Sequence, residues 1–188
     1  LQPLLPHYVS SVDSGNLAGH LLTLAAGLRE LADEKILGPH VFCGLRDTVG
    51  VLKKLAGAKT ALAQLDAQLT NVPAALPAAF VALSRAARLA AGLPATLANE
   101  SEETKRWALM LQRNCEDHLA DLLALAPWLR NPTPSQPAVD PTSGDGTPTL
   151  REIAEADAPP GAPDEGLGAG RDFARERLAL LEVLAQQC

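Results

Sequence analysis

Leucines recur at helical spacing through most of this chain, and this periodicity constrains its fold more than any other feature. Leu17, Leu21, Leu24, Leu28 and Leu31 follow one another at alternating steps of four and three residues, which places them along one side of an amphipathic helix. Aromatic residues make up only 3% of the 188 residues, and the β-branched residues that favour strands are sparse as well. Because alanine and leucine favour helices, we predict an all-α protein.

Proline and glycine mark the expected ends of the helices, since proline cannot continue a helix and glycine often caps one. Gly57 either divides the second helical region or only weakens it. We expect Asn99 to cap the long helix that follows, because Glu102 stands at the capping-box position. The predicted helical regions are about 16–37, 44–71, 77–92, 100–127 and 171–188, with a short helix near 150–156. The sequence TLRE, Thr149 to Glu152, is predicted to form a capping box that opens this short helix.

The fold class that these signals favour is an antiparallel helical bundle of about five to six helices with two long Pro/Gly-rich loops. Residues 1–130 form the predicted bundle. The segments 131–149 and 158–170 have almost nothing to bury, so we interpret 131–170 as loops around the short helix near 150–156. Residues 171–188 are predicted to form a C-terminal helix that docks on the bundle or leads to a next domain.

The net charge of the chain and the composition of its uncharged segments argue against nucleic acid and membranes as partners. The net charge is -6, and no block of lysine and arginine is present, so nucleic acid is not an expected partner. An anionic membrane surface is disfavoured for the same reason. The longest uncharged stretch, 67–84, contains two prolines and several polar residues. We therefore expect no direct membrane insertion.

The cysteines and histidines show no metal-ligand or disulfide pattern. Cys43, Cys115 and Cys188 are odd in number and far apart, and the histidines have no HxxxH spacing. We expect no metal and no other cofactor, and unpaired thiols fit a reducing compartment. A small helical enzyme using Cys43 and His40 is a further hypothesis, but a structural cysteine is favoured because no activated environment is evident.

The stretch SSVDSGN, residues 10–16, has two interpretations. Ser11, Asp13 or Ser14 could cap the helix that follows. If the helix begins earlier, Asp13, Asn16 and His20 fall at i, i+3 and i+7 on one face, where they could hydrogen-bond sugar hydroxyls. Tyr8 could then supply a stacking surface. From chemistry alone the cap is favoured over the site.

Other polar and aromatic residues have similarly open roles. Trp107 fits the buried stripe of its helix, whereas Trp128 could lie in the core or serve as a sugar platform. Arg46-Asp47 could be an ion pair or could orient a ligand. Asp117 and Asp121 lie one helical turn apart and are expected on the solvated side of their helix.

The stretch YVSSVDSGNLAGHLLTLAAGLREL, Tyr8 to Leu31, resembles the cyclic β-1,2-glucan synthetases of bacteria, with weaker support at Gly44 to Thr48. The resemblance implies a very large inner-membrane parent. It would combine a UDP-glucose glucosyltransferase, a cyclising transglycosylase and a phosphorylase-like region. This chain would be the helical region that precedes the glycoamylase-like cyclisation domain. No catalytic residue carries over, because the transglycosylation carboxylates are expected in that domain.

On this basis we expect a non-catalytic helical segment of a cyclic β-1,2-glucan synthetase, on the cytoplasmic side of the bacterial inner membrane. The expected partners are adjacent domains of the same polypeptide and linear β-1,2-glucan, with Tyr8, Asp13, Asn16 and His20 as the substrate-binding candidates. Isolated from its neighbours, the chain could form a homodimer. The alternative is a stand-alone helical protein–protein interaction module. A reading frame that continues well past Cys188 would favour the first hypothesis.

Overall fold

The computed structural model of the chain describes residues 10–71, 73–130, 147–156 and 164–188, with the side chains of 164–167 excepted. This part of the chain contains eight α-helices, one 3-10 helix and no strand, so the all-α prediction is confirmed. The helices are α1 (Ser11–Glu30), α2 (Pro39–Ala56), α3 (Thr60–Thr70), α4 (Leu76–Ala91), α5 (Leu93–Thr96), α6 (Glu102–Leu125), η1 (Pro127–Arg130), α7 (Leu150–Glu155) and α8 (Asp164–Gln187).

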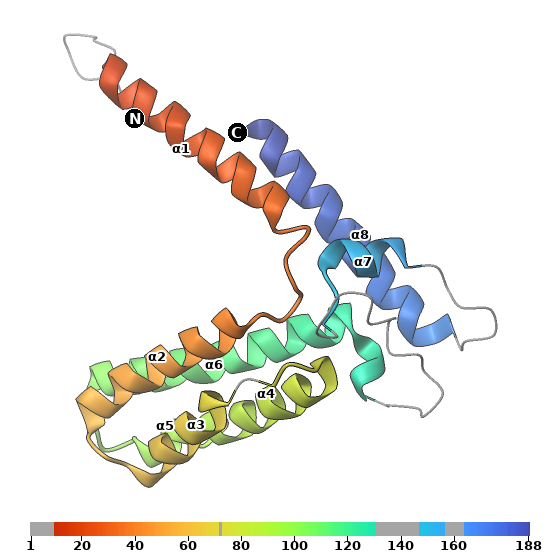
Figure 1. The fold of residues 1–188 in the computed structure, drawn as a ribbon. Helices are drawn as coiled ribbons and strands as arrows, with labels where there is room; N and C mark the ends of the chain where they lie inside the picture. Colours follow the sequence, from red (N-terminus) through yellow and green to blue (C-terminus); the bar gives the residue numbers. More distant parts are fainter. Residues whose placement is uncertain (1–9, 72, 131–146, 157–163) are drawn as a thin grey trace.

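Four of these helices enclose the main hydrophobic core (Figure 1). Helices α2, α3, α4 and α6 pack in a closed arrangement in which α2 and α4 each contact both α3 and α6. The core is made mostly of leucine and alanine, together with Phe42, Val49 and Cys115, and leucines such as Leu52, Leu65, Leu83 and Leu111 are fully buried. Full burial of a leucine stabilises a fold by about 1.5–3 kcal/mol relative to exposure. These four helices are therefore the rigid part of the molecule.

The helix boundaries correct several sequence predictions. Helix α2 begins at Pro39 rather than near Gly44, because proline at a first helical position needs no hydrogen-bond acceptor for an N–H. Gly57 has a φ of 73° and ends α2, so the region 44–71 forms two helices. Helix α6 is capped by Ser101, whose side chain accepts from the Thr104 N–H, and not by Asn99.

Helices α1 and α8 pack against each other and project away from the four-helix core (Figure 1). They run antiparallel, and we call this pair the α1–α8 hairpin, although α1 and α8 lie at opposite ends of the sequence. Helix α1 ends at Glu30, well before the predicted stop at Gly38-Pro39. The backbone after α1 instead pairs with the segment that leads into α7: the Ile36 N–H donates to the Pro148 carbonyl.

A second, smaller cluster of buried side chains anchors the root of the hairpin. It joins α6, α7 and α8 through Leu125, Leu150, Ile153 and Ala174. Helix α8 begins at Asp164 rather than at Arg171, so the end of the predicted loop 158–170 is helical. The predicted loop 131–149 lies outside the described residues except for its last three positions.

One stretch, Leu76–Thr96, is long and apolar enough to cross a membrane by length and composition. It comprises α4 and α5, and 44% of its apolar window is buried inside the structure. Leu83, Ala86 and Ala90 of this stretch are fully buried in the four-helix core. Packing within the protein therefore accounts for the apolarity of the buried side of this stretch.

Candidate functional site

The SSVDSGN stretch forms the first turns of α1. Ser10 is the N-cap: its side-chain oxygen accepts a hydrogen bond of 3.1 Å from the Asp13 N–H. The prediction that Ser11, Asp13 or Ser14 caps this helix was therefore wrong by one residue or more. A serine at the position before the helix satisfies one of the amides that have no partner within it. The Asp13 carboxylate lies in the first turn, where the helix dipole favours negative charge.

Asp13, Asn16 and His20 lie within α1 at positions i, i+3 and i+7, so they share one side of the helix. All three are exposed, and they make no side-chain hydrogen bond or ion pair with the rest of the described chain. Tyr8, the fourth candidate, lies outside the described residues. The sugar-binding role of these four residues stays a prediction.

The cysteines differ in environment. Cys115 is buried on α6, and burial raises the pKa of its thiol to about 12. Cys43 is exposed on α2, one helical turn from His40. In the described part of the chain, no group of three or more His, Cys, Asp or Glu side chains could hold a metal ion.

The other candidate side chains serve packing and helix pairing. Trp107 and Trp128 are half-buried against the main core. Arg46 pairs with Asp66 of α3 at 3.1 Å rather than with its neighbour Asp47. Asp121 of α6 pairs with Arg177 of α8 at 2.8 Å, so it ties the core to the hairpin.

Asp66 is the centre of a polar contact that the sequence did not predict. It accepts hydrogen bonds from Lys53 and Arg46 of α2, and these two cations, Lys53 first, lower the pKa of its carboxyl. Lys53 and Arg46 lie two turns apart on α2, a spacing that places them on one side of the helix. That spacing was visible in the sequence, but it could not identify Asp66 on another helix as their shared partner.

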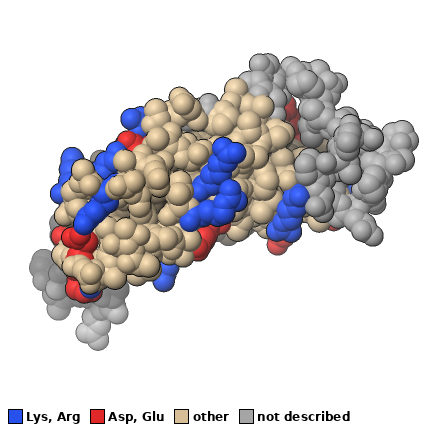
Figure 2. All heavy atoms as spheres, turned by 90° about the horizontal axis from the view of Figure 1, so that it is seen from below, with Lys and Arg blue, Asp and Glu red and all other residues tan. Residues whose placement is uncertain are grey.

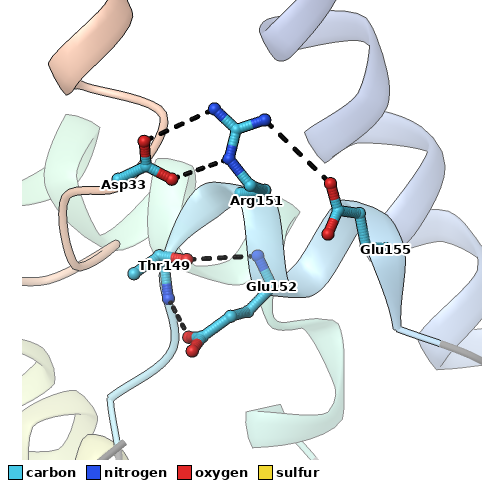
Figure 3. Close-up of polar contacts among 5 residues, drawn as sticks. All are labelled: Asp33, Thr149, Arg151, Glu152 and Glu155. Carbon is cyan, nitrogen blue, oxygen red and sulfur yellow. Dashed lines mark hydrogen bonds and ion pairs between the residues drawn. The ribbon is translucent and has the colours of Figure 1, made fainter.

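A polar clasp holds α7 on the segment that connects α1 and α2 (Figure 3). Arg151 donates to both carboxylate oxygens of Asp33, at 2.7 and 3.4 Å, and lies 4.0 Å from Glu155. The predicted capping box of α7 is confirmed: Glu152 N–H donates to Thr149 Oγ1, and the Glu152 carboxylate accepts from the Thr149 N–H. The clasp joins residues 118 positions apart in the sequence.

Exposed leucines gather on one side of the α1–α8 hairpin. Leu17, Leu24 and Leu31 follow one another at about two helical turns, and they are 60%, 52% and 50% exposed. A groove of about 640 Å³ at the root of the hairpin brings Leu31 together with Leu180 of α8, which is 57% exposed. A second groove along the hairpin is mixed in polarity: Leu28, Ala32, Leu178 and Leu181 line it together with Arg29, Asp33, Arg151, Glu182 and Gln186.

We call the side with the exposed leucines the apolar side of the hairpin and define it by Leu17, Leu24, Leu31, Leu180 and Leu184. The sequence predicted the leucine stripe of α1 correctly as a stripe. It did not identify the surface that covers this stripe, and within this structure only Ala25 of α1 is buried. Exposed leucines gathered on one side of a helix pair are a feature of interaction surfaces.

The chain is similar to part of one curated protein, the cyclic beta-(1,2)-glucan synthase NdvB of Rhizobium meliloti (strain 1021). The two sequences are 32% identical over 153 residues, which cover 64% of this chain and 5% of NdvB. The resemblance inferred from the Tyr8 to Leu31 stretch is thereby confirmed as a sequence relationship with a segment of a much longer protein. None of the known protein-family profiles matches the chain. No solved structure matches it either.

Proposed function

We propose that this chain is a non-catalytic helical segment of a cyclic β-1,2-glucan synthase-type polypeptide. In this proposal the apolar side of the α1–α8 hairpin packs against an adjacent domain of the same polypeptide and braces it. The cyclisation domain implied by the resemblance is the domain we assign to this position. The observation that carries the proposal is the row of half-exposed leucines on one side of the hairpin, in a chain related to 5% of a glucan synthase.

The extent of the apolar side supports docking against a protein surface. A helix of 20 residues is about 30 Å long and about 10–12 Å wide, so two paired helices present roughly 600 Å². A standard protein–protein interface buries about 800 Å² on each partner. Five leucines that are 40–60% exposed would each contribute about 1 kcal/mol when covered. Such a surface suits a permanent neighbour within one polypeptide.

Hydrogen exchange in the polypeptide translated from the full reading frame tests this proposal. We expect the amides of α1 around Leu17 and Leu24 to exchange at least tenfold more slowly there than in the 188-residue chain. The double variant Leu17→Gln, Leu24→Gln should remove that protection. The matched control is Val12→Gln, Leu22→Gln, since these residues are 70% and 71% exposed on other sides of α1.

Equal exchange in the two polypeptides would contradict docking within one chain. A reading frame that ends near Cys188, together with dimers or complexes lost in Leu17→Gln, Leu24→Gln, would instead favour the stand-alone interaction module. That alternative uses the same apolar side, so the two hypotheses differ only in the identity of the partner.

The proposal places the segment on the cytoplasmic side of the inner membrane, as part of a membrane-anchored parent and without insertion of its own. The absence of insertion is supported by the packing of Leu76–Thr96 against the four-helix core, which buries 44% of its apolar window. Alkaline extraction should release the 188-residue chain from membranes and leave the longer polypeptide bound. Retention of the short chain would contradict this placement.

A further inference from the structure

A groove lies between α3 and α4, on the four-helix core and away from the SSVDSGN stretch of α1. It is a shallow groove, open to solvent, with a volume of about 930 Å³. Both helices that form it belong to the main core, where Leu65, Leu69 and Leu83 are buried. The walls of this groove are therefore fixed by packing.

One wall of the groove carries three amide side chains. Gln64, Gln68 and Asn71 line it at steps of four and three residues, so they stand in a row along one side of α3 and its C-cap. The row extends about 10 Å along the helix. No side-chain hydrogen bond joins these three amides to the rest of the described chain. Each amide offers both donors and an acceptor, which matches hydroxyl groups that also donate and accept.

The remainder of the groove is apolar apart from one cation. Ala67, Ala78, Val81 and Leu89 contribute to its lining, and the charged residue among the lining residues is Arg85 of α4. The face seen from below, on which α3, α4 and α5 lie, has few acidic side chains among scattered lysines and arginines (Figure 2). An anionic ligand would call for several cations, and a cationic one for carboxylates. The lining instead suits an uncharged ligand with hydroxyl edges and apolar C–H faces.

We propose that the α3–α4 groove binds a linear, uncharged glucan chain along the row of amides, with Arg85 donating to hydroxyl or ring oxygens. The choice of glucan rests on the proposed function, while the location and the polarity rest on the groove itself. This site is distinct from the predicted one at Tyr8, Asp13, Asn16 and His20. It gives the segment a way to hold the growing polymer while the hairpin packs elsewhere.

Titration of the 188-residue chain with linear β-1,2-glucan oligosaccharides tests the site, read by calorimetry and by amide NMR shifts. We expect saturable shifts along α3 and α4. The variant Gln64→Ala, Gln68→Ala should bind at least tenfold more weakly, and alanine keeps α3 helical. Arg85→Ala should also weaken binding. The matched control is Asn114→Ala, which removes an exposed amide of α6 far from the groove lining and should leave binding unchanged.

Three results would overturn this inference. Shifts confined to α1 around Asp13 and His20 would assign the glucan to the predicted site instead. Glucan binding that is equally strong in the Gln64→Ala, Gln68→Ala variant would refute the role of the amides. Binding of an uncharged Gly/Ser peptide to the chain as tightly as glucan would refute selective sugar recognition by the groove. A complete absence of binding would refute glucan binding in the α3–α4 groove. It would not affect the docking proposal, which hydrogen exchange of α1 tests separately.

Discussion

Gly170 lies where α8 passes the end of α6, and its replacement by alanine tests how the hairpin is anchored. A Cβ at this position would stand 2.6 Å from the Leu125 carbonyl oxygen and 3.0 Å from Pro127 Cδ. Ordinary contacts begin at 3.4 Å, so α8 or the α6 backbone would have to move by roughly 0.8 Å. The two atoms belong to backbone and to a proline ring, and neither can rotate away.

Two opposing effects set the expected change in the free energy of unfolding of Gly170→Ala. Overpacking against rigid atoms costs about 1–3 kcal/mol, and the higher helix propensity of alanine returns about 1 kcal/mol. We expect Gly170→Ala to lower the free energy of unfolding by about 1 kcal/mol. The matched control is Gly44→Ala in α2, where nothing lies within 4 Å of the new Cβ and a gain of about 1 kcal/mol is expected.

Thermal unfolding followed by circular dichroism measures the midpoint temperatures of both variants, and hydrogen exchange of α8 amides shows where stability is lost. The midpoint temperatures should differ by about 4–8 °C in total, since about 1 kcal/mol corresponds to 2–4 °C for a chain of this size. A Gly170→Ala variant as stable as Gly44→Ala, with unchanged exchange in α8, would refute the close approach of α8 to α6.

Three further predictions concern single side chains. Arg151, chiefly through its hydrogen bonds, holds the pKa of Asp33 below its ordinary 3.8. The contribution of this pair to the free energy of unfolding is therefore full above pH 3.8 and is lost as pH falls through the pKa of Asp33 in the folded state. The readout is the protection of the Arg151 amide, that is, its exchange rate relative to the intrinsic rate of an unprotected amide at the same pH. Acid should lower the protection of this amide, which bonds to the Ala32 carbonyl, and Asp33→Asn should lower it already at neutral pH. Protection that does not change with pH in wild type would contradict the clasp. Cys115 should resist alkylation in the native state while exposed Cys43 reacts, because burial keeps the Cys115 thiol protonated at neutral pH; mass spectrometry showing equal labelling would contradict its burial. Ser10→Ala should reduce the stability of the first turns of α1 by about 1 kcal/mol, seen as faster exchange near Asp13, and unchanged exchange would refute the cap.

The sequence predicted the helices well where periodicity and capping act locally. The leucine stripes and the scarcity of strand-forming residues predicted the all-α class, and TLRE predicted the capping box of α7 because both of its hydrogen bonds span only three residues. The predicted helix boundaries were wrong where two sequence signals compete. Ser101 was overlooked in favour of Asn99, and Pro39 was interpreted as an end although proline is also common at a helix start.

Contacts between distant segments could not be predicted from one sequence. The pairing of Asp33 with Arg151, and of Asp121 with Arg177, depends on how the helices pack, and nothing local to these residues identifies the partner. The exposure of Leu17 and Leu24 could not be predicted for a related reason: an amphipathic stripe predicts that a helix has an apolar side, but not which surface covers it. The amide row of α3 was overlooked because its partner wall, α4, lies beyond a turn.

The most direct test of the central claim is the hydrogen exchange of α1 in the polypeptide of the full reading frame against that in the 188-residue chain. We predict slowing by at least tenfold at the amides around Leu17 and Leu24, abolished by Leu17→Gln, Leu24→Gln and retained in Val12→Gln, Leu22→Gln. Identical exchange rates in both polypeptides would contradict the claim that the apolar side of the hairpin packs against a neighbouring domain.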